Sequence, residues 1–456
     1  MKVTQVALLP TESSRAEGRP ALTPELLAAT GARYSRNNEG LEAILSKIDP
    51  NNLDKSVDSI FRMIDYGHQS IADMAPVAMF IDDISMWLAY FVWSVCPTAG
   101  GQESSTRYIR LSPEGLIEPK YVSQDEVTTD RWRATMAQSF DAYHQALNYW
   151  EGLVRDDPLL ARVPSELLED TSDKAKKQVA RMLRNYAFDR ARYFLPLAVK
   201  TNMMLVMSAR AWVQLCQNLL SHQVTESNEL GALVADELNL VAPRLLKHAT
   251  KRESFEAGLK REFEETREIS RAVPVTGVAD DTAYLEVFPA SNERFVQDIG
   301  GRENRYGYLG MDLRRTAVRF GWNAVAIAEI RDLNRHRTGT KFCPLAPVGF
   351  YAALDQTDTP SPSLSKLYQA GTETTQSARK LLIDGDPSYV YWTLLGTQYP
   401  FEHTTTADKY IYEAELRTGT GAHYRYAKHL RESLNIWYER YPETRGMVQE
   451  GKAEPE

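Results

Sequence analysis

The alternation of apolar and polar residues predicts a chain that mixes strands with helices. Residues 3–9 alternate in this way and are expected to form an opening strand, and residues 77–81 a second one. The Ser85 hydroxyl is expected to cap the apolar helix that follows, and Pro97 to end that helix. Further stretches repeat their apolar residues at helical spacing, at 132–154, 173–186, 203–220 and 229–248.

The second half of the chain repeats this order of elements at an offset of 240 residues. The tripeptide at 66–68 matches the one at 306–308, and Phe80 matches Phe320. Few residues are identical, so the match alone is weak. The order still recurs, because a short strand and then a helix with Asn323 as its cap are expected here.

Two tandem repeats are therefore expected, joined by the charged run at 251–271, which is predicted to be a solvated helix. The boundary falls near 273–281, so that residues 1–272 form the first repeat and residues 282–456 a second, shorter one. In the second repeat, residues 389–394 are predicted to be a strand and residues 410–438 helical. The polar tail from Gly446 is expected to be disordered.

Composition then narrows the class of protein. The 456 residues are enough for large cores, and the formal charge of −8 argues against a general nucleic-acid binder. The three cysteines fit neither a metal site nor a disulfide framework, which is typical of a reducing compartment. The most apolar run has only 14 residues, from Ile84 to Pro97, and no secretory signal is recognised. We expect a cytoplasmic protein without a membrane span or a metal ion.

Two polar motifs follow apolar runs, one in each half. The first half contains Gly67, His68, Gln69, Ser70 and Asp73, and later Glu103, Ser105, Arg107 and Tyr108. The second half contains Arg335, His336 and Arg337. At these residues the chain resembles the flavin-dependent thymidylate synthase family, whose signature is Arg-His-Arg, seven residues, then Ser, with an upstream Gly-His-x-Ser.

Each half departs from that signature in a complementary way. Val95-Cys96-Pro97 stands where the first half should have Arg-His-Arg, and in the second half Cys343 and Leu345 replace the Glu and Ser. Superposing the halves at an offset of 240 restores one complete signature. The resemblance therefore implies an α+β fold of two tandem, partly degenerate repeats, each a small sheet packed with long helices, that share composite sites.

Downstream residues continue the likeness. Arg192 and Arg210 match the family's substrate- and flavin-binding helix, although Ser208 replaces its usual Asn. The family's next phosphate-binding arginine has no counterpart near Leu219, and Arg417 in the second half resembles it. In that half Pro400 and Thr405 keep the spacing of Pro196 and Thr201.

The resemblance implies C5 methylation of dUMP with methylenetetrahydrofolate, NADPH and FAD. Arginine suits both a phosphate and a uracil that gains negative charge, because its planar fork donates two parallel hydrogen bonds. The implied catalytic residues are Ser105 and Arg107. The implied nucleotide contacts are Glu103, Ser105, Arg107, Tyr108, Arg192 and Arg417. The implied FAD contacts are His68, Ser70, Asp73, Glu103, Arg210, Arg335, His336 and Arg337. A homodimer would supply four repeats.

Plainer interpretations stay open for each motif. Glu103 to Tyr108 is also typical of a polar turn, and Arg335 to Arg337 of cations at a helix C-terminus. Arg192 and Arg210 are expected to pair with carboxylates, and Arg417 follows Glu413 at the spacing of a helical ion pair. Two rival functions follow: a flavoenzyme that acts on another pyrimidine nucleotide, and a non-catalytic nucleotide-binding or scaffold homologue that has lost flavin.

Overall fold

The computed structural model describes residues 1–36, 38, 40–49, 51–61, 69–107, 111–288, 294–452 and 454. The chain divides into two compact units, each assembled from two separate stretches. Unit 1 contains Met1–Ser105 and Lys200–Phe263, and unit 2 contains Thr106–Val199 and Glu264–Glu456. The predicted division into repeats at 272 and 282 is a different kind of boundary, and it stays a prediction.

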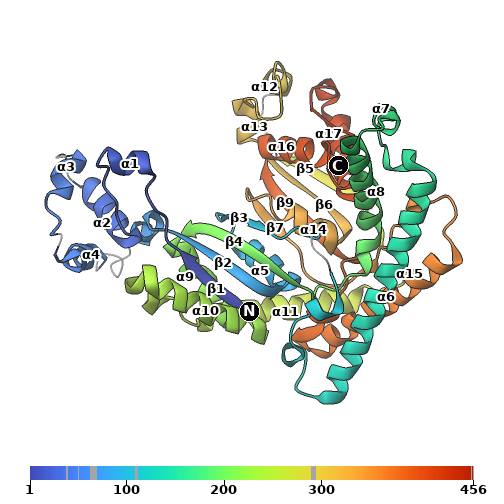
Figure 1. Cartoon of the computed structure of the whole chain (residues 1–456), viewed down its shortest axis with the longest axis horizontal. Coiled ribbons are helices and arrows are strands. Elements are labelled where there is room, and N and C mark those ends of the chain that lie inside the picture. The colour runs from blue at the N-terminus through green and yellow to red at the C-terminus, as the bar shows by residue number, and fades with distance from the viewer. Residues whose placement is uncertain are drawn as a thin grey trace. The chain divides into compact units, whose positions relative to one another are not determined.

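Unit 1 is built on a four-stranded antiparallel sheet in the order β1-β2-β4-β3 (Figure 1). Its strands are β1 Lys2–Val6, β2 Pro76–Ser85, β3 Gly100–Glu103 and β4 Lys200–Ser208. Its helices are α1 Glu12–Ala16, α2 Pro24–Tyr34, α3 Gly40–Leu45, α4 Leu53–Phe61, α5 Met86–Val95, α9 Ala209–Ser221 and α10 Thr225–Val241. Helix α11 Glu253–Ala272 contains the point at which the chain passes from unit 1 to unit 2.

The start of α5 confirms the cap predicted at Ser85. The Ser85 hydroxyl accepts a hydrogen bond from the Leu88 amide at 2.9 Å, and it donates to Glu226 at 2.7 Å. The helix is apolar on nearly all sides, and Trp87 and Leu88 are buried. A helix of this composition belongs in a core, which agrees with its predicted burial.

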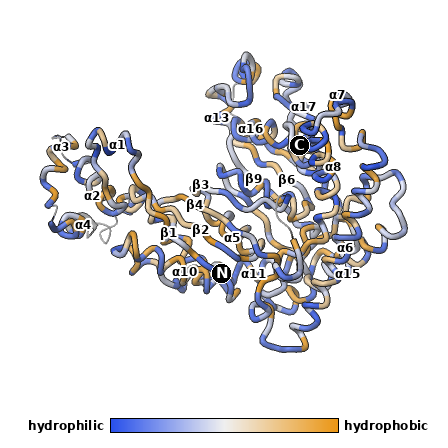
Figure 2. The backbone as a smooth tube through the Cα atoms, viewed as in Figure 1, coloured by the Kyte–Doolittle hydropathy of each residue, from blue (hydrophilic) through white to orange (hydrophobic). Residues whose placement is uncertain are grey.

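Unit 2 is built on a sheet in the order β5-β6-β9-β7, with β8 also paired to β9. Its strands are β5 Ala283–Phe288, β6 Ala317–Ala326, β7 Thr340–Phe342, β8 Gly349–Phe350 and β9 Thr397–Thr406 (Figure 1). Its helices are α6 Glu126–Asp156, α7 Ser165–Glu169, α8 Asp173–Ala191, α12 Phe295–Ile299, α13 Met311–Arg315, α14 Ile327–Leu333, α15 Pro362–Asp384, α16 Ala407–Thr418 and α17 Tyr424–Arg440. The predicted mixture of helices and sheet is confirmed. Figure 2 shows hydrophilic and hydrophobic positions alternating along α6, as its predicted amphipathic character requires.

The two sheets share strand order, antiparallel pairing and the position of a bulge. In unit 1 the register shifts between Ile81 and Ile84, and in unit 2 it shifts between Trp322 and Val325. These bulges are 241 residues apart, so in strand register Met79 rather than Phe80 is the counterpart of Phe320. Glu103 pairs with Met203 of β4, and β7, if continued by one residue, would pair Cys343 with Phe401 of β9. Met203 and Phe401 are equivalent at an offset of 198, so Glu103 and Cys343 keep the offset of 240.

Inside unit 2, two loops from the two halves of the chain pair reciprocally. The Leu197 amide donates to the Thr393 carbonyl at 2.9 Å, and the Leu395 amide donates to the Leu195 carbonyl at 2.7 Å. An offset of 198 residues relates the two bonds, and the same offset relates β4 to β9. Reciprocal contacts between equivalent residues are typical of a twofold interface.

Several predictions of secondary-structure elements are wrong. Residues 200–208 and 397–406 form the central strands β4 and β9, whereas the first range was predicted to lie largely in a helix. Burial alternates along β4, so Met203, Leu205 and Met207 share one face. Residues 389–394 lie mostly in the 3-10 helix Pro387–Trp392 instead of a strand, and Ala326 rather than Asn323 is the N-cap of α14.

No helix within the described residues has the length and apolar character that a membrane crossing requires.

Candidate functional site

The predicted residues of the first motif lie in unit 1. Glu103 is buried at the end of β3 and pairs with Met203 of β4, and Ser105 is half-buried just beyond. The Ser104 amide donates to the Asn202 carbonyl at 2.9 Å, which continues the ladder by one residue. The edge of the sheet thus fixes the backbone that presents Ser105. His68 and Tyr108 lie outside the described residues.

Three further residues predicted to contact FAD lie at the other end of β4. Ser70 is exposed in the 3-10 helix Gln69–Met74, and Arg210 donates to the Asp73 carboxylate at 2.8 Å. Ser208 caps α9 and donates to Asp73 at 3.3 Å. Both members of the ion pair are more than a third exposed, so it contributes little to stability. Arg210 also lines a pocket of about 160 Å³ in unit 1.

Unit 2 holds all of the arginines predicted to bind the nucleotide. Arg107 donates from Nε and Nη2 to the two carboxylate oxygens of Asp189 on α8, with an Nε–Oδ1 distance of 2.9 Å. The Asp189 side chain is 3% exposed. This bidentate geometry is the one in which arginine holds a carboxylate or a phosphate most strongly.

Arg192 lies close to this pair and is fully enclosed in the 3-10 helix Arg192–Phe194. Its Nη2 donates to the Ala328 carbonyl at 3.4 Å, and its buried Nε has no hydrogen-bond partner among the described residues. Burial lowers the pKa of Arg192, but the carboxylates of Asp189 and Asp332 reverse the direction and raise it. Arg192 therefore stays charged, with a donor to spare.

Arg417 ends α16 and contacts the predicted flavin motif directly. Its Nε donates to Nε2 of His336 at 2.7 Å, and its Nη2 donates to the Asp332 carbonyl at 2.8 Å. An imidazole nitrogen that accepts from a guanidinium has no proton, so His336 is neutral in this geometry. Burial, reinforced by Arg417, lowers the pKa of His336 to about 3, although Glu413 opposes the shift.

Glu413 does not form the helical ion pair with Arg417 that the spacing of four permitted. Its carboxylate instead lies 3.0 Å from Nδ1 of His403 and 3.9 Å from Nδ1 of His336. Burial favours the neutral carboxyl, but the two histidines and Lys341 outweigh it and hold the pKa of Glu413 below its ordinary value. Glu413 therefore lies on the Nδ1 side of both imidazoles, while Arg417 donates to Nε2 of His336.

Asp332 is the centre of this group, and sequence reasoning missed it. Burial raises the pKa of its carboxyl, but the nearby guanidinium groups lower it below its ordinary value. These arginines, in order of effect, are Arg335, Arg192, Arg417 and Arg331. Arg335 Nη1 lies 4.0 Å from Asp332 at a separation of three residues, a helical spacing that was visible in the sequence.

His423 completes the group, and Tyr426 packs beside it. The His423 ring caps α17 by accepting from the Arg425 amide at 3.2 Å, and its Nε2 lies 3.3 Å from the Asp189 carbonyl. The Tyr426 ring lies under the Arg417 guanidinium at 5.3 Å. We call the group of Arg107, Asp189, Arg192, Asp332, Arg335, His336, Arg417 and His423 the arginine cluster. It joins predicted residues from both halves of the sequence inside one unit.

One set of side chains has the spacing of a metal site, at the far side of α17. Oxygen and nitrogen ligand atoms of Asp281, His429 and Glu432 lie within 4.8 Å of one another. Asp281 is already bound by Arg425 and by Lys428, the latter at 2.8 Å. Two neighbouring cations disfavour a further positive ion, so this set makes a poor metal site.

Comparison with known proteins relates the chain to one family. Residues 21–244 match the family described as thymidylate synthase complementing protein, so the chain is similar to that family over this range. This similarity supports a thymidylate synthase-like role and an enzyme of that type.

The matches to individual proteins are more distant. The UPF0159 protein Ta1429 of Thermoplasma acidophilum is 22% identical over 446 residues, which cover 86% of this chain and 88% of that protein, and its name states no activity. Two Helicobacter pylori structures of flavin-dependent thymidylate synthase with FAD and dUMP are 16% identical. They cover 55% of this chain and all of theirs at TM-scores of 0.31 and 0.32, too low to support any argument about architecture.

Proposed function

We propose that this protein is an FAD-dependent thymidylate synthase-like enzyme that methylates C5 of dUMP with methylenetetrahydrofolate and NADPH. The observation that carries the proposal is the arginine cluster. Arg107 and Arg192 from the first half of the sequence lie with Arg335 and Arg417 from the second half around Asp189 and Asp332. A composite site requires arginines from both halves to lie together. Two repeats that had degenerated independently would have no reason to bring them together.

The cluster suits the binding of a nucleotide phosphate. Arg107, Arg192 and Arg417 concentrate guanidinium donors in a buried region, where charge-assisted hydrogen bonds are strongest. A dianionic phosphate would replace Asp189 as the partner of the Arg107 fork. Ser105 and Glu103, two and four residues before Arg107, are proposed to contact the uracil.

FAD is proposed as the cofactor, and it supplies the reducing electrons when bound. Arg335 and Arg337 follow the end of α14, and we propose that they hold its phosphates. For unit 1, the resemblance separately assigns Arg210, Ser70, Asp73 and His68 to flavin contacts. His336 has a different task in this geometry, because its Nε2 already accepts from Arg417. It positions the phosphate arginine next to the flavin arginines.

The doubled strand order supports the tandem arrangement on which this proposal depends. The reciprocal bonds of Leu197 and Leu395 support it as well. A dimer of this chain would then supply four repeats.

An assay of tritium release from C5-labelled dUMP tests the proposal, with FAD, methylenetetrahydrofolate and NADPH supplied to the full chain. We expect release that depends on each of the three, together with flavin absorbance of the purified protein. Release from labelled dCMP or UMP in place of dUMP would support the rival flavoenzyme. A protein that takes up no FAD and releases no tritium would contradict both enzyme hypotheses.

A further inference from the structure

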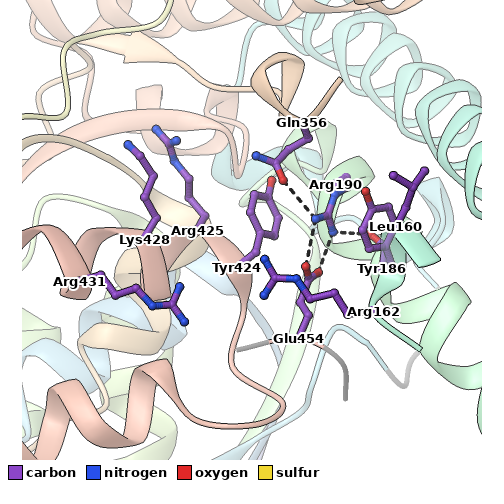
Figure 3. Close-up of a pocket in the computed structure, with 10 residues that line it drawn as sticks. All are labelled: Leu160, Arg162, Tyr186, Arg190, Gln356, Tyr424, Arg425, Lys428, Arg431 and Glu454. Atoms are coloured by element: carbon purple, nitrogen blue, oxygen red, sulfur yellow. Dashed lines mark hydrogen bonds and ion pairs between the residues drawn. The ribbon is translucent and has the colours of Figure 1, made fainter. Parts of the chain in front are cut away.

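A second basic pocket lies in unit 2, and none of the predicted site residues lines it. Its volume is about 300 Å³, at the lower end of the range of about 300–1,000 Å³ that is typical of small-molecule sites. Its cationic lining residues are Arg162, Arg190, Arg425, Lys428 and Arg431, against one lining carboxylate, Glu454 (Figure 3). In a protein of net charge −8, such a concentration of positive charge is a local feature.

Glu454 occupies this pocket as a bound anion would. Its two carboxylate oxygens accept from the two terminal nitrogens of Arg190 at 2.8 and 3.2 Å, a fork-to-fork pair (Figure 3). The side chains of Arg190 and Glu454 are 3% and 11% exposed. Tyr186 and Tyr424 lie against the guanidinium at 3.3 and 4.2 Å from their ring centres. Arg190 is therefore a rigid, buried and desolvated anion receptor.

Two of the other cations, Arg162 and Arg431, hold the same segment through its backbone, whereas Arg425 and Lys428 are paired with Asp281. Residues 449–452 and 454 are here called the tail segment. Arg431 donates to the Gly451 carbonyl at 2.9 Å, and Arg162 donates to the Lys452 carbonyl at 2.6 Å. The tail was predicted to be disordered, and its described residues instead make defined contacts. A carbonyl oxygen carries no full negative charge, so these two contacts do not neutralise Arg162 or Arg431, and Glu450 compensates Arg431 only in part.

Two observations point to a ligand with more negative charge than one carboxylate. Burial lowers the pKa of Arg431, and the nearby Arg162 lowers it further while Glu450 opposes the shift, so two like charges lie close together. Arg162 also has a left-handed backbone with φ of +52°, a conformation that is strained for a side chain of this size. Strain of this kind is concentrated at functional sites, where the surroundings maintain it.

We propose that this pocket binds a small molecule with a multivalent anionic group, a diphosphate or a cluster of carboxylates, and that Glu454 competes with it. A diphosphate or a tricarboxylate offers enough oxygens to reach Arg190, Arg162 and Arg431 together, whereas both oxygens of the Glu454 carboxylate accept from Arg190. Binding displaces Glu454 from Arg190 and releases the tail segment.

Calorimetric titration of the full chain with inorganic pyrophosphate, and separately with citrate, tests this site. Glu454→Gln removes the competing charge and is expected to tighten binding about tenfold, while Arg431→Gln is expected to weaken it about tenfold, each the effect of one charge-assisted contact. Arg155→Gln is the matched control, because Arg155 lies on α6 with 78% of its side chain exposed, and its affinity is expected to be unchanged. Tighter pyrophosphate binding identifies a phosphate ligand, and tighter citrate binding a carboxylate ligand.

Equal affinity of the unaltered protein, Glu454→Gln and Arg431→Gln for both anions would overturn the proposal. The Arg107→Gln variant separates this pocket from the arginine cluster, since it is expected to retain the enhancement by Glu454→Gln. Loss of that enhancement would place the anion at Arg107 and likewise overturn it. If Arg431→Gln fails to fold, Arg162→Gln, at an exposed contact to the same segment, provides the same test.

Discussion

The pairing of Arg107 with Asp189 predicts a large and specific effect of Asp189→Asn on stability. The substitution preserves the shape of the side chain and removes the charge that a bidentate guanidinium faces at 3% exposure. Loss of one partner of a buried ion pair costs about 3–5 kcal/mol, because the other charge stays buried. We expect the lower end, about 3 kcal/mol, since Asp332 lies close enough to compensate Arg107 in part.

Urea unfolding followed by tryptophan fluorescence measures this loss. With a slope of about 3 kcal/mol/M, a loss of about 3 kcal/mol lowers the midpoint of the transition that involves unit 2 by about 1 M. Asp73→Asn is the matched control, because Asp73 pairs with Arg210 at 46% exposure and its loss is expected to cost less than about 1 kcal/mol. Equal midpoints for the two variants would refute the account of Arg107 as a buried, charge-compensated arginine.

Three further predictions concern the same region. Burial raises the pKa of the Glu329 carboxyl to about 7 from an ordinary value of 4.5, although Tyr193, which donates to it at 2.8 Å, opposes the shift. The stability that the protonated carboxyl contributes is therefore full below about pH 4.5 and is lost as the pH rises through 7. Glu329→Gln is expected to abolish that fall, of up to about 3 kcal/mol, in urea unfolding at pH 5 and pH 8; a fall of the same size in the variant would contradict it. Arg417→Gln removes the hydrogen bond that keeps His336 neutral, so the pKa of His336 is expected to rise in an NMR titration, and an unchanged pKa would show that burial alone depresses it. Arg335→Ala is expected to lower FAD affinity about tenfold by fluorescence quenching, with Arg314→Ala on α13 as control, and equal affinities would exclude Arg335 from the flavin site.

The sequence predicted the elements whose local signals and packing agree. The cap at Ser85, the long helices α6 and α8 and the charged helix α11 have regular spacing or clear ends, and all are present. The central strands were missed because β4 and β9 run directly into α9 and α16, with no glycine or proline at either junction to mark the end of the strand. The ends of β4 and β9 are set by their pairing with the adjacent strands β2 and β6, respectively.

The candidate site was predictable residue by residue but not in its connections. By the register of β4 and β9, Leu219 is the equivalent of Arg417, 198 residues earlier. The phosphate arginine was predicted to be missing from the first half near Leu219 and to be supplied by Arg417. The same register pairs Pro196 with Leu394, so the predicted match to Pro400 is wrong. Asp332 was missed because two of the arginines that lower its pKa, Arg192 and Arg417, are far away in the sequence.

The central claim is that arginines from the two halves of the chain act in one nucleotide site. A double-mutant cycle of Arg107→Ala and Arg417→Ala, read as the dUMP dissociation constant by calorimetry, tests it most directly. We predict that each single substitution weakens binding at least about tenfold and that the double variant loses at least about 0.5 kcal/mol less than the sum, since both arginines bind one phosphate. Undiminished dUMP affinity in either single variant, or strictly additive losses, would contradict a composite site.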